Sequence, residues 1–305
     1  MVVVADLDPQ LEAAIRAVPA WSGLEPEAAP IAAGITNRNF RVDIGGESFV
    51  VRLSGRDTEL LGIDRAAECE AARAVAAVGV APEVFAFLPE HGCLITRFVE
   101  GRPIPEADLE RGEVLERVVA SVRAIHGVPP IPSTFNAFRV VEKYRVVAQS
   151  RGVPIPDAFE VARDRAREIE KAFAAAPIPE RPCHDDLLNA NFLRDGDHVW
   201  IVDYEYAGMG DLFFDLGNLS INNGLSDDAQ EMLLGLYFGD VTDSHRARLG
   251  LMRIMSDFRE AMWGVVQQGL STLDFDYVAY AGKHFTRLLT TAADPRFEDW
   301  LQAVA

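Results

Sequence analysis

Three polar side chains in the second half of the chain have the types and spacing that phosphoryl transfer from ATP requires. Asp186 and Asn191 are separated by four residues, and Asp203 follows the apolar run 199–202. At the spacing Asp-x-x-x-x-Asn, the aspartate can accept the proton of an attacking hydroxyl while the asparagine holds magnesium. A second aspartate at the end of a strand supplies another metal ligand. We therefore expect Asp186 to be the catalytic base, with Asn191 and Asp203 binding Mg²⁺.

The segment between Asn191 and Asp203 predicts a hairpin that brings the two residues together. Asp195-Gly196-Asp197 is a strong turn signal, and short apolar runs flank it at 192–193 and 199–202. An acidic residue that ends a buried strand is expected to be paired or bound to metal. A solvated acidic loop would explain a single aspartate, but it does not explain the whole pattern, which matches the catalytic loop of protein kinases.

Composition restricts the class of protein and its partners. A chain of 305 residues, 49% hydrophobic and 25% charged, is long enough for two lobes and typical of a soluble enzyme. The net charge of -18 argues against nucleic acid or an anionic membrane as a partner and favours a cationic small molecule. Cys69, Cys93 and Cys183 are far apart and are interpreted as buried thiols in a reducing compartment. Without a recognisable signal peptide or membrane span, the sequence predicts a cytoplasmic protein.

The chain divides into a strand-rich first part and a helical second part. Strands are predicted at 40–44, 48–53, 84–87 and 93–99, with a helix at 64–78. Residues 100–103 look like a linker. Helices are then predicted at 107–126, 157–175, 227–238, 244–268 and 276–290. We predict an α+β fold with a small β-rich nucleotide-binding lobe, residues 1–99, and a larger, mainly helical catalytic and substrate-binding lobe, residues 100–305. Ligands are expected in the cleft between the lobes.

Candidate phosphate-binding residues lie between the first strands. A glycine at position 34 is followed by Thr36, Asn37 and Asn39, small polar residues whose backbone and side chains can approach phosphate oxygens. This loop is a weak signal alone and is interpreted as a phosphate cover because of its place in the chain.

A basic residue on the next strand completes the predicted nucleotide site. Arg52 can neutralise phosphate and pair with a carboxylate on the following helix, where Glu68 and Glu70 are both candidates. The segment 96–100, with Phe98 and Val99, is expected to be the hinge that offers backbone groups to adenine.

These motifs carry a family resemblance. The chain resembles the choline/ethanolamine kinase family, within the wider group of aminoglycoside-phosphotransferase-like kinases, from about residue 31 to residue 285. The matching segments are Gly34-Ile35-Thr36-Asn37-Arg38-Asn39, His184-x-Asp186-x-x-x-x-Asn191, Val202-Asp203-Tyr204-Glu205-Tyr206, Asp211 to Asn218, Arg259 to Gly264 and Phe275 to Tyr280.

The resemblance implies a protein-kinase-like fold and roles for further residues. His184 and Asp215 would buttress the catalytic loop, and Glu205 would lie near the metals or the acceptor. The acceptor pocket would be lined by the aromatic residues Tyr206, Trp263 and Tyr280.

Two departures from the family pattern concern the acceptor pocket. Choline kinases commonly carry an acid where this chain has Asn222, and often a second tryptophan where it has Val266. Because a quaternary ammonium needs aromatic faces and nearby negative charge, choline recognition is expected to be weaker. The leading hypothesis is an ATP-dependent kinase of choline or a related amino alcohol. The alternatives are a kinase of an aminoglycoside, an amino sugar or thiamine, and a catalytically inactive nucleotide-binding relative.

Overall fold

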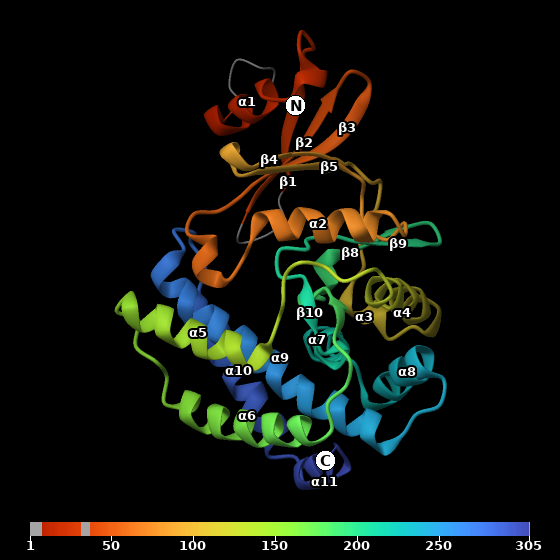
Figure 1. Cartoon of the computed structure of the whole chain (residues 1–305), viewed down its shortest axis with the longest axis vertical. Helices are drawn as coiled ribbons and strands as arrows, with labels where there is room; N and C mark the ends of the chain where they lie inside the picture. Colours follow the sequence, from red (N-terminus) through yellow and green to blue (C-terminus); the bar gives the residue numbers. More distant parts are fainter. Residues whose placement is uncertain (1–7, 32–36, 305) are drawn as a thin grey trace.

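The strand-rich part forms a five-stranded antiparallel sheet at one end of the molecule (Figure 1). The computed structural model describes residues 8–31 and 37–304, so the predicted phosphate-binding Thr36 lies outside the described residues. The sheet order is β1 (Glu27–Ile31), β2 (Arg38–Ile44), β3 (Glu47–Leu53), β5 (Cys93–Arg97) and β4 (Val84–Leu88). The turn between β2 and β3 is Gly45-Gly46, and both glycines have positive φ, as a tight hairpin requires. Arg52 is thereby placed in the central strand of the sheet.

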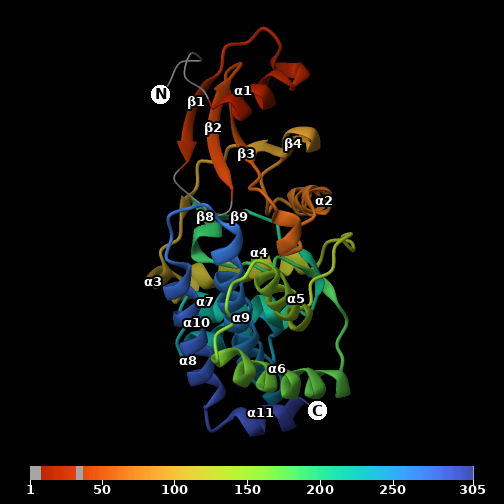
Figure 2. The ribbon, with the colours of Figure 1, turned by 90° about the vertical axis from the view of Figure 1, so that its left-hand side faces the viewer.

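Helix α1 (Pro9–Arg16) covers the sheet, and its apolar residues join Phe49, Val51 and Ile95 in a first hydrophobic core. Helix α2 (Arg65–Ala76) begins at Asp64, whose carboxylate accepts hydrogen bonds from the backbone N–H groups of Ala66 and Ala67. It runs between the sheet and the helical part of the molecule (Figures 1 and 2). Its buried residues Ala71, Ala72 and Val75 belong to the core of the helical part. The predicted boundary between residues 99 and 100 therefore stays a prediction, since packing crosses it.

The helical part is built around one long helix, α9 (Asp243–Leu270), whose central residues are buried almost without interruption. Its neighbours include α5 (Ala137–Ser150), α7 (Leu212–Asn222), α10 (Tyr277–Ala292) and α11 (Phe297–Val304). The remaining helices are α3 (Glu106–Leu109), α4 (Gly112–His126), α6 (Ala158–Ala175) and α8 (Asp227–Phe238). Two small sheets lie towards the first lobe: β7 (Arg181–Cys183) pairs with β10 (Gly208–Gly210), and β6 (Arg102–Pro103), β8 (Phe192–Asp195) and β9 (His198–Ile201) form the other. No helix of the described residues is both long and apolar enough to cross a bilayer.

The predicted strands, the predicted helices and the hairpin between Asn191 and Asp203 are confirmed, with two corrections. The helix expected at 107–126 is broken at 110–111 into α3 and α4, and the expected linker 100–103 supplies the short strand β6. Helices α1, α5, α7 and α11 and strands β7 and β10 were not predicted, and strand β1 was only implied, without bounds, by the expected loop between the first strands. Three polar residues of α7, Asp215, Asn218 and Asn222, recur at helical spacing, a pattern that was not used to predict the helix. Its Gly217 lies so close to α9 that an added Cβ would stand 2.7 Å from the carbonyl carbon of Met252.

Candidate active site

The predicted catalytic loop, residues 184–191, lies between two small sheets that fix both of its ends. β7 leads into it and pairs with β10, and the β8–β9 hairpin folds back behind it. The backbone N–H of Val202 donates to the carbonyl of Asn191 at 3.1 Å. The two predicted metal-binding residues are therefore held side by side by the hairpin, as the sequence indicated.

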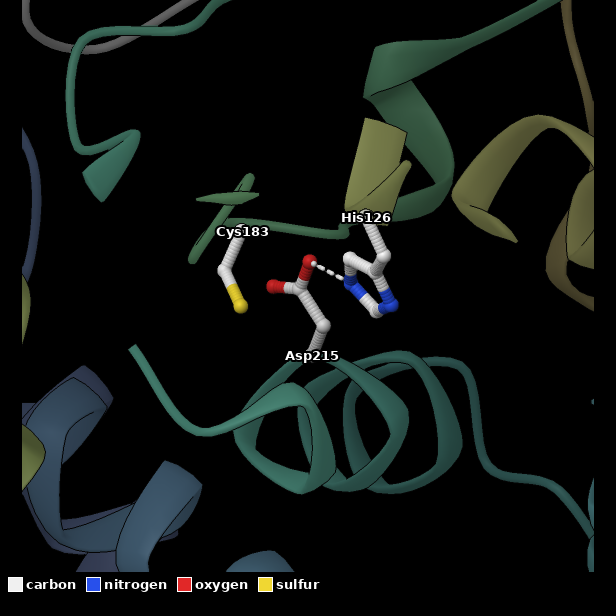
Figure 3. A group of neighbouring side chains, drawn as sticks. All are labelled: His126, Cys183 and Asp215. Atoms are coloured by element: carbon white, nitrogen blue, oxygen red, sulfur yellow. Dashed lines mark hydrogen bonds and ion pairs between the residues drawn. The ribbon is translucent and has the colours of Figure 1, made fainter. Parts of the chain in front are cut away.

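Asp215, on α7, fastens the start of the loop (Figure 3). Its fully buried carboxylate accepts the backbone N–H groups of His184 at 2.8 Å and Asp185 at 2.7 Å, and His126 Nε2 lies 3.0 Å from it. Burial acts to raise the pKa of Asp215, but these hydrogen bonds outweigh it and the pKa lies below its usual value. The carboxylate is therefore held ionised as an anchor for the loop.

The side chains of His126, Cys183 and Asp215 form a compact buried group, shown in Figure 3. Their potential ligand atoms lie within 4.8 Å of one another. However, the Asp215 oxygens already accept the donors described above, and His126 Nδ1 lies 2.7 Å from the Tyr237 hydroxyl. These contacts favour a hydrogen-bonded brace over a metal site.

His184 connects the two halves of the site. Its Nε2 donates to the carbonyl of Val202 at 3.0 Å, and its Nδ1 accepts the backbone N–H of Asp186 at 3.3 Å. Burial lowers the pKa of His184, so the ring is neutral at physiological pH, which matches this pattern of one donor and one acceptor. The contacts are those of the loop buttress implied by the resemblance.

Asp186 lines the cavity and is held on two sides. Asn191 Nδ2 donates to its backbone carbonyl at 2.8 Å, and Arg259 Nη1 lies 3.2 Å from its Oδ1. Burial raises the pKa of Asp186 to about 7, against the opposing effect of Arg259 and with a further contribution from the nearby acid Glu260. A carboxyl group with a pKa near neutrality is suited to accepting a proton from an alcohol.

Asp203 reaches the cavity from a strained backbone. Its φ is 72°, in the left-handed region that residues other than glycine rarely adopt. Its Oδ1 accepts a hydrogen bond of 2.7 Å from Arg52 Nη1. The structure thus places a predicted metal ligand against the predicted phosphate-binding arginine. A strained backbone of the kind seen at Asp203 is typical of functional sites.

Arg52 also resolves an alternative that the sequence left open. Its Nη2 pairs with Glu68, which is 2% exposed, whereas Glu70 is on the exposed face of α2. Arg52 therefore bridges the carboxylate of α2 and that of Asp203 in the other lobe.

A second arginine, Arg65, completes a network that sequence reasoning missed. Arg65 Nη1 lies 2.8 Å from Glu68 Oε2 and 3.0 Å from Glu205 Oε2, and Arg65 Nη2 donates to Asn37 Oδ1 at 3.1 Å. Asn37 Nδ2 donates to the same Glu205 oxygen at 2.8 Å. Glu205 lines the cavity, and its Oε2 is held by two groups from the first lobe.

The other predicted nucleotide-binding residues line the same cavity. Asn39, Phe98 and Val99 are all part of its wall. The backbone N–H of Phe98 donates to the carbonyl of Ser48 at 3.0 Å, and the Arg41 guanidinium lies 4.4 Å from the centre of the Phe98 ring. The hinge is thereby fixed to the sheet.

The predicted aromatic residues meet at the opposite end. Trp263 Nε1 donates to the Tyr206 hydroxyl at 3.0 Å, and the Trp263 and Tyr280 rings pack edge to face with centroids 5.5 Å apart. The Tyr280 hydroxyl donates to Glu260 Oε2 at 2.7 Å. Because each polar edge is bonded within the protein, the rings are held in fixed positions around the cavity.

The structure corrects the expected place of Asn222. This residue ends α7, and its Oδ1 accepts a hydrogen bond of 3.0 Å from Arg287 Nη2. It is absent from the described residues that line the cavity. Helix α7 turns this side chain towards α10, so sequence position alone did not predict its neighbours.

One cavity of about 700 Å³ joins these groups. It extends from the hinge, past the ion pairs of Arg52 and the catalytic loop, to the aromatic residues of α9 and α10. Its wall includes Asn37, Asn39, Arg52, Glu68, Phe98, Val99, Asp186, Asn191, Asp203, Glu205, Tyr206, Arg259, Glu260, Trp263 and Tyr280.

The model of the phosphotransferase enzyme family matches residues 27–250, which include every part of the catalytic loop. The chain belongs to this family. A crystal structure of a choline/ethanolamine kinase family protein from Mesorhizobium loti is similar over 97% of this chain and 98% of that one, with 31% identity and a TM-score of 0.83. The choline/ethanolamine kinase family is thus the branch to which the chain belongs.

Two other similar proteins agree with this family assignment. Ethanolamine kinase 1 of Mus musculus is 25% identical over 88% of this chain and 85% of its own length. The crystal structure of choline kinase LicA from Streptococcus pneumoniae shares the fold, with 20% identity, coverage of 88% and 93% and a TM-score of 0.77. The protein is therefore a small-molecule kinase with a protein-kinase-like fold.

Sequence reasoning assigned no role to Arg65, Arg259 and Glu260. The last two form an adjacent pair of charges within the long, otherwise mostly apolar centre of α9. Burying adjacent opposite charges in a helix is costly unless the charges are paired. The presence of Arg and Glu in this apolar stretch could therefore have indicated a buried ion pair.

Proposed function

We propose that this kinase transfers the γ-phosphoryl group of ATP to the hydroxyl of choline or a related amino alcohol. One observation carries the proposal: a single cavity is lined by the ion-pair network of Arg52, by Asp186 and by a group of aromatic rings. The domain prediction is retained here, with residues 1–99 contributing the nucleotide side and residues 100–305 contributing Asp186 and the acceptor side.

Arg52 supports the assignment of the nucleotide side. Its guanidinium is buried in the cavity wall and oriented by Glu68, so it can meet phosphate oxygens without first being ordered. The predicted hinge residues Phe98 and Val99 are apolar members of the cavity wall on this side, where we place the adenine.

Asn191 and Asp203 fit a magnesium ion by the chemistry of their donors. Asn191 uses its amide nitrogen to hold the Asp186 carbonyl, which leaves its amide oxygen for a metal. Asp203 engages Arg52 through Oδ1, which leaves Oδ2. Oxygen ligands of this kind suit Mg²⁺, which would neutralise charge on the phosphates when bound.

The acceptor side supports a cationic alcohol. Tyr206, Trp263 and Tyr280 are aromatic, and aromatic faces attract ammonium groups. Asp186 is positioned to take the proton of the acceptor hydroxyl, because its carboxylate lies in the same cavity and is oriented by Arg259.

The test is a panel of acceptors incubated with Mg-ATP and analysed for phosphorylated product by mass spectrometry. Choline and ethanolamine are the expected substrates, with an aminoglycoside, an amino sugar and thiamine as comparisons. Product from one of the comparisons alone would replace the amino alcohol with that substrate. ATP hydrolysis with no phosphorylated acceptor in the panel would contradict the proposal.

A further inference from the structure

The acceptor side has an acid that does not come from the position expected of the family. Asn222 lies outside the cavity and is bonded to Arg287. Glu260, on α9, does line the cavity and is directly bonded to one of the aromatic residues, through the Tyr280 hydroxyl at 2.7 Å. Trp263 follows it by three residues, on the same face of the helix. The carboxylate is thus built into the aromatic group itself.

The positive charge beside this acid is shared with a second carboxyl group. Arg259 Nη1 lies 2.6 Å from Glu260 Oε1 and 3.2 Å from Asp186 Oδ1, so one guanidinium serves two carboxylates. The Arg259 guanidinium also stacks 4.2 Å from the centre of the Tyr206 ring, which fixes its place. His284 packs behind Tyr280, but its Nδ1 is bonded to the Asp257 carboxylate at 2.8 Å. An acceptor with a positive charge would add to the single guanidinium that the two carboxyl groups share.

The other acid near the aromatic residues is less suited to this task. Glu205 Oε2 is already bonded to Arg65 and Asn37 from the first lobe. Arg65 also pairs with Glu68, so Glu205 belongs to the ion-pair network of the first lobe, whereas Glu260 is bonded to Tyr280 on the acceptor side.

We propose that Glu260 is the residue that selects a cationic acceptor, supplying from α9 the negative charge that the chain lacks at Asn222. This inference rests on the proposed function, since it concerns the acceptor of the same reaction. Glu260 acts through charge and through the position of Tyr280, and it takes no part in proton transfer.

The test compares choline with its neutral isostere 3,3-dimethylbutan-1-ol, which has the same shape and hydroxyl but no charge. Both alcohols are supplied together with Mg-ATP, and the ratio of the two phosphorylated products gives the ratio of their kcat/KM values. At an effective dielectric constant of about 20, a unit charge about 5 Å away contributes more than a factor of ten. Glu260→Gln is therefore expected to lower the choline preference by at least about tenfold.

Asp257→Asn is the matched control, because Asp257 is a buried acid one turn earlier on the same helix that does not line the cavity. Its product ratio is expected to equal that of the unaltered protein. Tyr280→Phe keeps the ring and the Glu260 charge, so it should change the ratio much less than Glu260→Gln. If Glu260→Gln does not fold, a second measurement is made by calorimetry. The Kd values of both alcohols are determined for Tyr280→Phe and for the unaltered protein. A choline preference of less than tenfold in the unaltered protein would overturn the inference.

The outcomes separate this inference from the proposed function. Choline phosphorylation with an unchanged product ratio in Glu260→Gln would overturn the role of Glu260 and leave the function standing. Failure of the unaltered protein to phosphorylate any amino alcohol would overturn both.

Discussion

The shared guanidinium of Arg259 leads to a stability prediction that can be made quantitative. Arg259 is 2% exposed and pairs with Glu260 at 2.6 Å and Asp186 at 3.2 Å. Replacing it with methionine preserves much of the volume but leaves the buried Glu260 carboxylate and the partly buried Asp186 without their cation. Breaking a buried ion pair in this way costs about 3–5 kcal/mol. In a protein of this size, each kcal/mol lowers Tm by roughly 2–4 °C, so Arg259→Met should lower Tm by about 6–20 °C.

The double variant Arg259→Met/Glu260→Gln distinguishes lost charge compensation from lost packing. Removing the Glu260 charge relieves the uncompensated site, so the double variant should recover part of the lost stability. Thermal unfolding followed by circular dichroism, together with urea titration, measures both variants at pH 7. The reasoning is refuted if Arg259→Met unfolds at the temperature of the unaltered protein, or if the double variant is no more stable than the single one.

Three further predictions concern the reaction. Asp186→Asn should abolish phosphoryl transfer while nucleotide affinity stays nearly intact, because the base acts on the acceptor hydroxyl. Product formation measures the first effect and calorimetry with ATP the second. Near-normal turnover would remove Asp186 from the mechanism. Asp203→Ala should lose the magnesium-dependent part of nucleotide binding as well as turnover, and unchanged Mg-ATP affinity by calorimetry would contradict this. Trp263→Ala should raise the acceptor KM by at least tenfold and leave the ATP KM unchanged, since a cation-π contact is worth about 2 kcal/mol, or about 30-fold in affinity. Trp263→Phe should recover part of the loss. An unaltered acceptor KM in Trp263→Ala would argue against an aromatic cation pocket.

Much of the fold followed from local patterns. The hairpin turn at Gly45-Gly46, the start of α2 at Asp64 and the β8–β9 turn each depend on a few consecutive residues, so they were predictable. Helix α7 was not predicted, because its polar residues Asp215 and Asn218 are buried and do not mark a solvent-exposed face. Its place is decided by the close approach of Gly217 to α9.

The candidate site likewise has a part that local sequence patterns predicted and a part that they did not. The spacing of Asp186, Asn191 and Asp203 is set within one loop and one hairpin, and the sequence alone predicted that they meet. The braces from His184 and Asp215 were expected through the family resemblance, and the structure confirms their hydrogen bonds to the loop.

Only the tertiary structure decided which distant charges face one another. Glu68 and Glu70 are equivalent by type, and the orientation of α2 beneath the sheet turns Glu68 towards Arg52. Likewise, the packing of α9 against the catalytic loop brings Glu260 and Arg259 to Asp186. Long-range ion pairs depend on how whole helices are oriented, and that orientation is fixed by the summed burial of many apolar side chains rather than by the residues that pair.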